Sequence, residues 1–224
     1  MTIALTIEDD VATITLDDGK ANAINPDWMA AFIETFSKAE AGATAIVIAG
    51  RDGVFSGGFD LKWLATNGAE KGPLLLDLAS QMVIRVYGSP RPVVAACTGH
   101  AIAMGAFLLL TCDSRIGTKG DYKFGANETM NNMNLPVFAV ELPRDRLRNA
   151  YLTASLIQSQ MYNPDKALEV GYVDQLAERG STINTAVAVA SQLGKLPGRA
   201  YGANKLLLRQ PTIDLISAAI GKYG

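Results

Sequence analysis

Two glycine turns constrain the fold of this sequence more than any other feature. In the first, FSGGFD (residues 55 to 60), Gly57 and Gly58 separate the apolar run TAIVIAG from the helix-like DLKWLA. The second lies in GHAIAMGAFLLLTCDSRIG (residues 99 to 117), which repeats the order of strand, glycine turn and apolar helix. Because parallel strands that alternate with helices bring such turns to one edge of a sheet, the pattern predicts an α/β fold with two neighbouring turns.

Glycines at a strand-to-helix turn have two readings. They supply positive φ, which an ordinary tight turn requires. They also let a ligand approach the backbone closely, where the unpaired N–H groups at the start of a helix favour negative charge. Taken alone, the turn leaves both readings open.

The rest of the chain also alternates between strand and helix patterns. Residues 2 to 18 predict a hairpin, because apolar and polar residues alternate on both sides of the acidic turn. Asn25-Pro26-Asp27 and Asn163-Pro164-Asp165 are typical helix starts. Further helices are expected over residues 73 to 88 and 181 to 193, and a buried strand is expected over residues 93 to 97.

Composition excludes several classes of protein. Hydrophobic residues make up 49% of the 224 residues, charged residues 19%, and the formal net charge is −2. These values are typical of one globular domain and provide no electrostatic footprint for nucleic acid. The N-terminus lacks the pattern of a signal peptide, and the apolar runs are too short to span a bilayer, so we expect no membrane partner and a cytoplasmic location.

The sequence provides little for metal or nucleophilic chemistry. His100 is the only histidine, and Cys97 and Cys112 lie in apolar runs, so we expect no metal site and two reduced, buried thiols. We expect His100 to be a packed imidazole rather than a base. The sequence contains no G-x-S-x-G, P-loop or G-x-G-x-x-G motif, which removes the common hydrolase and nucleotide signatures.

Several motifs in order resemble the crotonase superfamily, the enoyl-CoA hydratase/isomerase family. They are GKANAIN, FSGGFDLKWL, GHAIAMGAFLLLTCDSRIG, FGANE and ALEVGYVDQLA, and the resemblance spans roughly residues 1 to 205. It implies a spiral of ββα units that binds acyl-CoA thioesters. Coenzyme A would enter as part of the substrate, with no permanently bound cofactor.

The resemblance assigns the two turns to an oxyanion hole. The backbone N–H groups of Phe59 and Met104 would hold the thioester oxygen, with Gly57, Gly58 and Gly105 beside them. Many relatives have three glycines where this chain has Ala103-Met104-Gly105. The N–H of Met104 can serve only if the backbone tolerates a β-carbon there.

In FGANETM, Glu128 matches a catalytic glutamate of the family. The alternative is a helix-cap or surface carboxylate. Apolar neighbours would raise the pKa of this group, which suits a residue that takes and returns a proton near neutral pH.

The second glutamate of the hydratases is replaced by Phe107. Hydration needs a water molecule held between two carboxylates, whereas moving a double bond needs one base. The sequence is therefore closest in pattern to Δ3,Δ2-enoyl-CoA isomerases, with a hydratase, a hydrolase, a decarboxylase or an inactive acyl-CoA-binding scaffold as alternatives. Glu141 stays as a second candidate acid.

Lys20, Ala21 and Lys62 match positions near the nucleotide of the coenzyme. Lysines suit its phosphates, but solvated surface lysines are the alternative. Asp60 and Asp113 are expected to cap helices or make structural hydrogen bonds.

The resemblance also implies a domain organisation and an assembly. Residues 1 to 180 would form the core spiral, and residues 181 to 224 a C-terminal helical region that is shorter than usual. Members are usually trimers or dimers of trimers, so we expect a homo-oligomer, a trimer or a hexamer.

Overall fold

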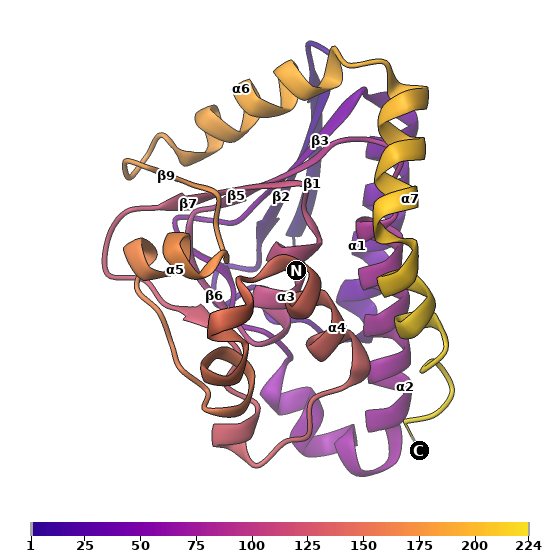
Figure 1. The fold of residues 1–224 in the computed structure, drawn as a ribbon, viewed down its shortest axis with the longest axis vertical. Coiled ribbons are helices and arrows are strands. Elements are labelled where there is room, and N and C mark those ends of the chain that lie inside the picture. The colour runs from indigo at the N-terminus through magenta and orange to yellow at the C-terminus, as the bar shows by residue number, and fades with distance from the viewer. Residues whose placement is uncertain (1, 224) are drawn as a thin grey trace.

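The computed structural model describes residues 2–223 (Figure 1). Its strands are β1 (Thr2–Glu8), β2 (Val11–Asp17), β3 (Ala45–Ala49), β4 (Gly53–Ser56), β5 (Val93–Cys97), β6 (Gly99–Ile102), β7 (Ser114–Thr118), β8 (Phe124–Gly125) and β9 (Gln175–Ala177). Its α-helices are α1 (Pro26–Gly42), α2 (Leu61–Tyr87), α3 (Met104–Thr111), α4 (Val137–Arg146), α5 (Pro164–Val170), α6 (Thr182–Gly194) and α7 (Gly198–Ser217).

The elements form the ββα spiral that the sequence predicts. The chain runs β1β2α1, β3β4α2 and β5β6α3. A six-stranded sheet has the order β1-β2-β3-β5-β7-β9, and a three-stranded sheet has the order β4-β6-β8. From β3 to β8, each successive pair of strands therefore contributes one strand to each sheet. All pairings except that of β1 with β2 are parallel.

Alternate residues of the large sheet enter two different cores. Ile46 and Ile48 of β3 point into the main core with α1, α2 and α3, whereas Ala45, Val47 and Ala49 face α6. Such alternation is what a pleated strand buried on both faces requires. Figure 1 shows α6 lying across the sheet and α7 running beside α2.

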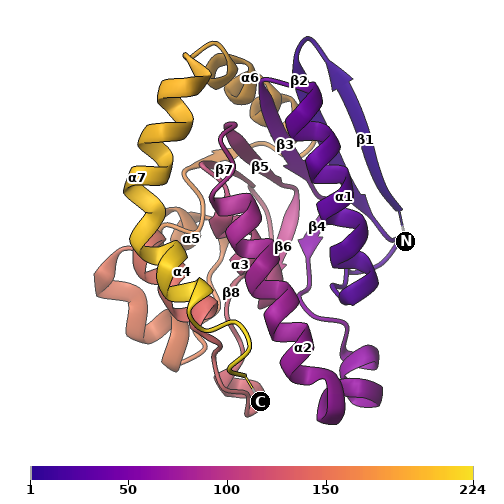
Figure 2. The same ribbon diagram turned by 90° about the vertical axis from the view of Figure 1, so that its right-hand side faces the viewer.

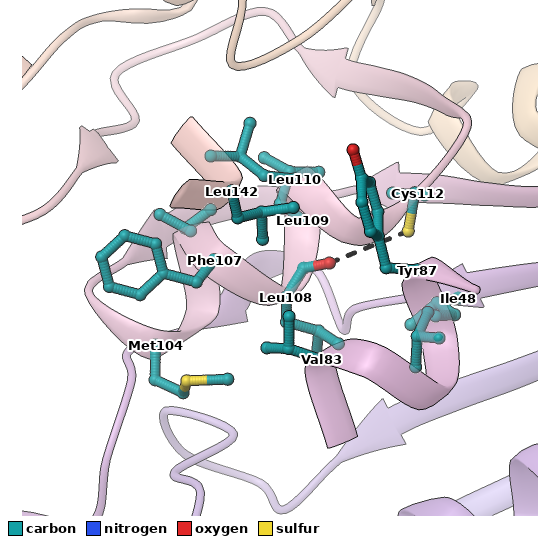
Figure 3. Close-up of a cluster of buried hydrophobic side chains, with 14 of the residues drawn as sticks. Ile48, Val83, Tyr87, Met104, Phe107, Leu108, Leu109, Leu110, Cys112 and Leu142 are labelled. Atoms are coloured by element: carbon teal, nitrogen blue, oxygen red, sulfur yellow. Dashed lines mark hydrogen bonds between the residues drawn. The ribbon is translucent and has the colours of Figure 1, made fainter. Parts of the chain in front are cut away.

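Helix α3 follows the second glycine turn and is buried on every side. Its apolar side chains are each at most 1% exposed. The run AFLLL explains this burial, because a helix that is apolar on all sides belongs inside a protein. Met104 and Phe107 lie at the same end of this cluster (Figure 3).

Helix α2 joins the helix-like DLKWLA and the helix expected over residues 73 to 88 into one longer helix. It begins at Leu61, because the carboxylate of Asp60 accepts hydrogen bonds from the amides of Lys62 (2.9 Å) and Trp63 (3.2 Å). The helix continues through Pro73, which lacks a donor but does not end it. Asp60 is thus the cap that the sequence predicts.

A buried ionic cluster attaches α7 to the sheet. Asp113, which directly precedes β7, accepts hydrogen bonds from Lys205 Nζ at 2.7 Å and from the amide of Val93 at 2.8 Å, and its other oxygen lies 2.8 Å from Arg209. The three charged side chains are each less than 10% exposed. Asp113 therefore has the structural role predicted for it. In the described part of the chain, no helix has the length and hydropathy needed to cross a membrane.

Candidate active site

A cavity of about 880 Å³ lies where the first glycine turn, α3 and the end of α7 meet. Three residues that the sequence singled out line it: Phe59, Phe107 and Glu128. The other lining residues come from α2, the loop into α4, the start of α4, the end of α7 and the segment after it: Leu76, Met133, Asn134, Leu135, Pro136, Val137, Phe138, Leu215, Ala218, Ala219, Lys222 and Tyr223. The wall is therefore mostly apolar, as ligand pockets are.

Glu128 is a buried carboxylate in this apolar wall. The residue is 8% exposed, and within the described chain its Oε2 atom has no hydrogen-bond partner. Burial raises the pKa of Glu128 above the usual range, and hydrogen bonds from its own amide and that of Asn127 offset this only in part. The sequence predicted this direction, and the carboxyl group is suited to exchange a proton.

The two glycine turns touch each other. Gly58 has φ +96°, and a β-carbon there would lie 2.9 Å from Ala103 Cβ and 3.2 Å from the Met104 nitrogen. At Gly105 a β-carbon would lie 2.3 Å from the Ser56 carbonyl oxygen. Both glycines are therefore required because the two turns pack closely against each other. This structural role is one of the two readings that the sequence left open.

Two amides at these turns are without acceptors. Over residues 2–223, neither the Phe59 N–H nor the Met104 N–H donates a hydrogen bond to another protein atom. The neighbouring amides of Gly57 and Asp60 are bonded to the carbonyls of Ala21 and Ile24, each at 2.8 Å. An unpaired backbone donor is available to an oxygen atom of a ligand, and of these two residues Phe59 lines the cavity.

In the second turn, the residue with positive φ is Ala103, which directly precedes the predicted donor Met104. Ala103 has φ +52° and ψ −125°, whereas Met104 is the first residue of α3. The concern about a β-carbon thus falls on Ala103, at a cost of about 1–3 kcal/mol. Phe59 lines the cavity but Met104 does not, and the Met104 side chain is buried in the core.

Phe107 occupies the cavity wall as a buried ring, 5.8 Å from the ring of Phe138 in an edge-to-face contact. Of the described residues that line the cavity, Glu128 is the only carboxylate. Glu141 is not among them, and its carboxylate pairs with Arg144 at 2.6 Å. His100 is also outside the cavity, half-buried, and its Nδ1 accepts the amide of Lys123 at 3.0 Å.

The residues predicted to lie near the nucleotide are exposed and do not line this cavity. Lys20 and Ala21 are in the loop after β2, where their carbonyls accept hydrogen bonds from Arg51 Nε (2.7 Å) and Gly57 N–H (2.8 Å). Lys62 is in the first turn of α2. Lys20 thus lies on a loop bonded to the first glycine turn region, and Lys62 lies in the helix that follows that turn.

The C-terminal segment contributes to the cavity, which the sequence did not indicate. Leu215, Lys222 and Tyr223 line the cavity, and Figure 2 shows the chain descending from α7 beside α2. The Gly221 amide donates to Asp77 at 2.8 Å, and the Tyr223 hydroxyl lies 3.2 Å from Ser80 Oγ. No motif marks these residues; the resemblance implied only a helical region over residues 181 to 224.

Residues 6–215 match the family model described as enoyl-CoA hydratase/isomerase. The chain belongs to this family. Its members act on acyl-CoA substrates, so the protein is an enzyme of the family. The predicted resemblance is thereby confirmed.

Solved structures of the enoyl-CoA hydratase/isomerase family match the whole fold. A family protein from Pseudomonas syringae is 38% identical, with a TM-score of 0.94 over 97% of this chain and 94% of that one. An enoyl-CoA isomerase of Mycobacterium tuberculosis is 35% identical (TM-score 0.92, coverage 97% and 95%). An enoyl-CoA hydratase from Mycobacterium marinum is 33% identical (TM-score 0.93, coverage 99% of each chain). Both reactions are thus named among the relatives.

Proposed function

We propose that the protein is a Δ3,Δ2-enoyl-CoA isomerase, which moves a double bond in the acyl chain of a coenzyme A thioester. The observation that carries this proposal is that Glu128 is the one carboxylate among the described residues of an apolar cavity wall. Phe107, at the position where hydratases have a second glutamate, lines the same wall. One base is sufficient for an isomerisation.

The reaction can be written with the residues at hand. Glu128 takes a proton from C2 of a 3-enoyl thioester, and the electron pair moves into a dienolate. The negative charge develops on the thioester oxygen, where the Phe59 and Met104 amides would stabilise it. Glu128 then returns the proton to C4, which leaves the double bond between C2 and C3. No atom is gained or lost.

The raised pKa of Glu128 supports this role. A carboxylate whose pKa is raised by burial is a stronger base than an exposed glutamate, so it takes the C2 proton more readily. A dry, apolar wall also protects a dienolate from side reactions with water. The same wall disfavours hydration, since a second carboxylate that would orient water is missing from the described lining.

The coenzyme would lie along the exposed loops beside the first glycine turn. Lys20 and Lys62 are exposed cations, and the carbonyl of Ala21 accepts a hydrogen bond from the Gly57 amide of the turn. Lysines of this kind bind phosphates as point charges. Coenzyme A would come and go with each substrate rather than stay as a cofactor.

Three further expectations belong to this proposal. They are a cytoplasmic location, a homo-oligomer of three or six chains, and a boundary near residue 180 between the spiral and the C-terminal helices. Sedimentation of the purified protein tests the assembly directly.

Product analysis on 3-enoyl-CoA and 2-enoyl-CoA thioesters tests the function. We expect conversion of the 3-enoyl to the 2-enoyl isomer to be faster than hydration of the 2-enoyl product. The ultraviolet absorbance of the 2-enoyl thioester follows the first rate, and chromatography of the 3-hydroxyacyl product follows the second. Faster hydration would favour the hydratase alternative, and binding of acyl-CoA without turnover would favour a scaffold.

Glu128→Gln keeps the shape and removes the base. Turnover should fall by about 10²–10⁴-fold with little change in affinity for substrate. An acyl-CoA should also bind more tightly than free coenzyme A in calorimetry, because the amides contact the thioester oxygen. Near-normal turnover of the variant would remove Glu128 from the mechanism.

A further inference from the structure

The turn that carries Glu128 rests on a second, distant segment of the chain. Thr129 Oγ1 donates to the carbonyl of Leu156 at 3.2 Å, and the Met130 amide donates to Ser159 Oγ at 3.0 Å. Both contacts come from the two residues that directly follow Glu128. Residues 153–159 therefore form a seat for the turn, and the Ser159 side chain of this seat accepts a hydrogen bond from the backbone of the turn.

Glu128 depends on its backbone for its position. Its Oε2 atom is buried and has no hydrogen-bond partner in the described chain, so the carboxylate is not fixed by a side-chain partner there. The turn itself is tightly closed, because the Glu128 carbonyl accepts the amides of Asn131 (3.0 Å) and Met133 (2.9 Å). A rigid turn moves as a unit, and its attachment to the seat determines where the carboxylate lies in the cavity.

The seat has an unusual backbone. Thr153–Ile157 is a π-helical turn, and Ser159, only 4% exposed, has φ +51°. π-Helical turns occur frequently at functional sites, and a residue with a side chain in the left-handed region costs about 1–3 kcal/mol. Glycine at this position would relieve the strain but would remove the hydroxyl that accepts the Met130 amide.

We propose that Ser159 is a positioning residue that holds Glu128 in place for proton transfer. It touches neither the substrate nor the reacting atoms and acts through the Met130 amide and the turn. The inference rests on the proposed role of Glu128 as the base. It adds a residue from a strained loop that no motif in the sequence indicates.

The test compares three variants by steady-state kinetics on a 3-enoyl-CoA. Ser159→Gly removes the hydroxyl and also the strain, so the variant should fold as well as the parent or better. Its kcat should fall by about 10–10²-fold, the scale of a misplacement of about 1 Å, while KM changes little.

Ser89→Ala is the matched control, because Ser89 is 1% exposed and its Oγ also accepts a backbone amide, that of Arg91 at 3.2 Å. Thr129→Val removes the other anchor and should act in the same direction, more weakly.

The pH dependence separates positioning from general loss of stability. If the turn moves, Glu128 becomes less buried, and the acid limb of the kcat profile should shift to lower pH in Ser159→Gly. A purely structural role would lower the melting temperature without moving this limb.

Two outcomes would overturn the proposal. One is a Ser159→Gly protein with the kcat and pH profile of the parent; the other is an equal loss of kcat in Ser89→Ala. If Ser159→Gly does not fold, Thr129→Val decides by the same two readouts, and an unchanged kcat and pH profile there overturns the proposal. Failure of the proposed function shows separately, as full turnover in Glu128→Gln.

Discussion

Gly58 and Ala103 bring the two glycine turns into contact: a β-carbon on Gly58 would lie 2.9 Å from the β-carbon of Ala103. The φ of Gly58 is +96° and that of Ala103 is +52°, so both turns use left-handed backbone at the point where they meet. The proposed oxyanion donors, Phe59 and Met104, each directly follow one of these residues. The spacing between the two donors therefore depends on this contact.

The contact predicts a large effect of Gly58→Ala. The new methyl group must displace the second turn, so we expect a loss of about 2–5 kcal/mol in the free energy of unfolding, from left-handed strain and overpacking together. Gly53→Ala is the control, because Gly53 has φ +82° but nothing within 4 Å of its β-position. Denaturant unfolding of both variants measures the difference, and equal losses would show that the contact contributes nothing.

The ionic cluster under α7 predicts the result of Asp113→Asn. This change leaves the buried cations of Lys205 and Arg209 without their counter-charge, and breaking a buried pair costs about 3–5 kcal/mol. Asp52→Asn breaks an exposed pair with Arg179 and should change stability very little. Thermal melting compares the two; a similar melting temperature for both variants would contradict this account.

The raised pKa of Glu128 predicts how stability depends on pH. In the unfolded chain this carboxyl group releases its proton near the ordinary value, whereas the folded protein retains it to higher pH. Its contribution to stability is therefore complete at low pH and is lost as pH rises from the unfolded pKa through the raised folded pKa. Glu128→Gln should be more stable than the parent at neutral pH and equal to it at low pH. Calorimetric melting across this range checks the sign.

The pH–rate profile provides a second test of the same group. Since the base must be ionised, kcat/KM should fall as pH decreases, with an apparent pKa above the usual range of a glutamate. A profile that falls only in the usual pH range of a glutamate would contradict a raised pKa for the base.

The C-terminal segment predicts a change in substrate range. Tyr223 lines the cavity, and its hydroxyl forms a hydrogen bond with Ser80 Oγ. Because the Ser80 hydroxyl donates to the Leu76 carbonyl at 2.8 Å, Tyr223 is the donor in this bond. Tyr223→Ala should favour longer acyl chains, by about fourfold in kcat/KM for each added methylene that becomes buried. Tyr223→Phe keeps the ring and should keep the parent profile. Rates over a series of 3-enoyl-CoA lengths decide between them.

Much of this molecule follows from local patterns. Alternation in β1 and β2, the Asn25-Pro26 start of α1 and the capping position of Asp60 are local signals, and the structure has each of them. The end of α2 near Gly88 also agrees. The helix-like DLKWLA and the helix expected from residue 73 are one continuous helix, because α2 tolerates Pro73.

The candidate site was only partly predictable for a physical reason. Motifs indicated Phe59, Phe107 and Glu128, which all line one cavity. The seat at Ser159 and the wall at Tyr223 arise from contacts between segments 29 and 143 residues apart. Such contacts depend on tertiary packing, and the local sequence at either end has no periodicity or turn chemistry that records them.

The contribution of α7 to the cavity wall couples ligand binding to local unfolding. A thioester that contacts Leu215 and Tyr223 binds only the state in which this helix is docked, so by mass action it must oppose undocking. The exchange of amide hydrogens along Gly198–Ser217 would then slow in proportion to ligand occupancy. Hydrogen exchange in α7 would thus measure whether a ligand occupies the cavity, although most of this helix lies outside the candidate active site.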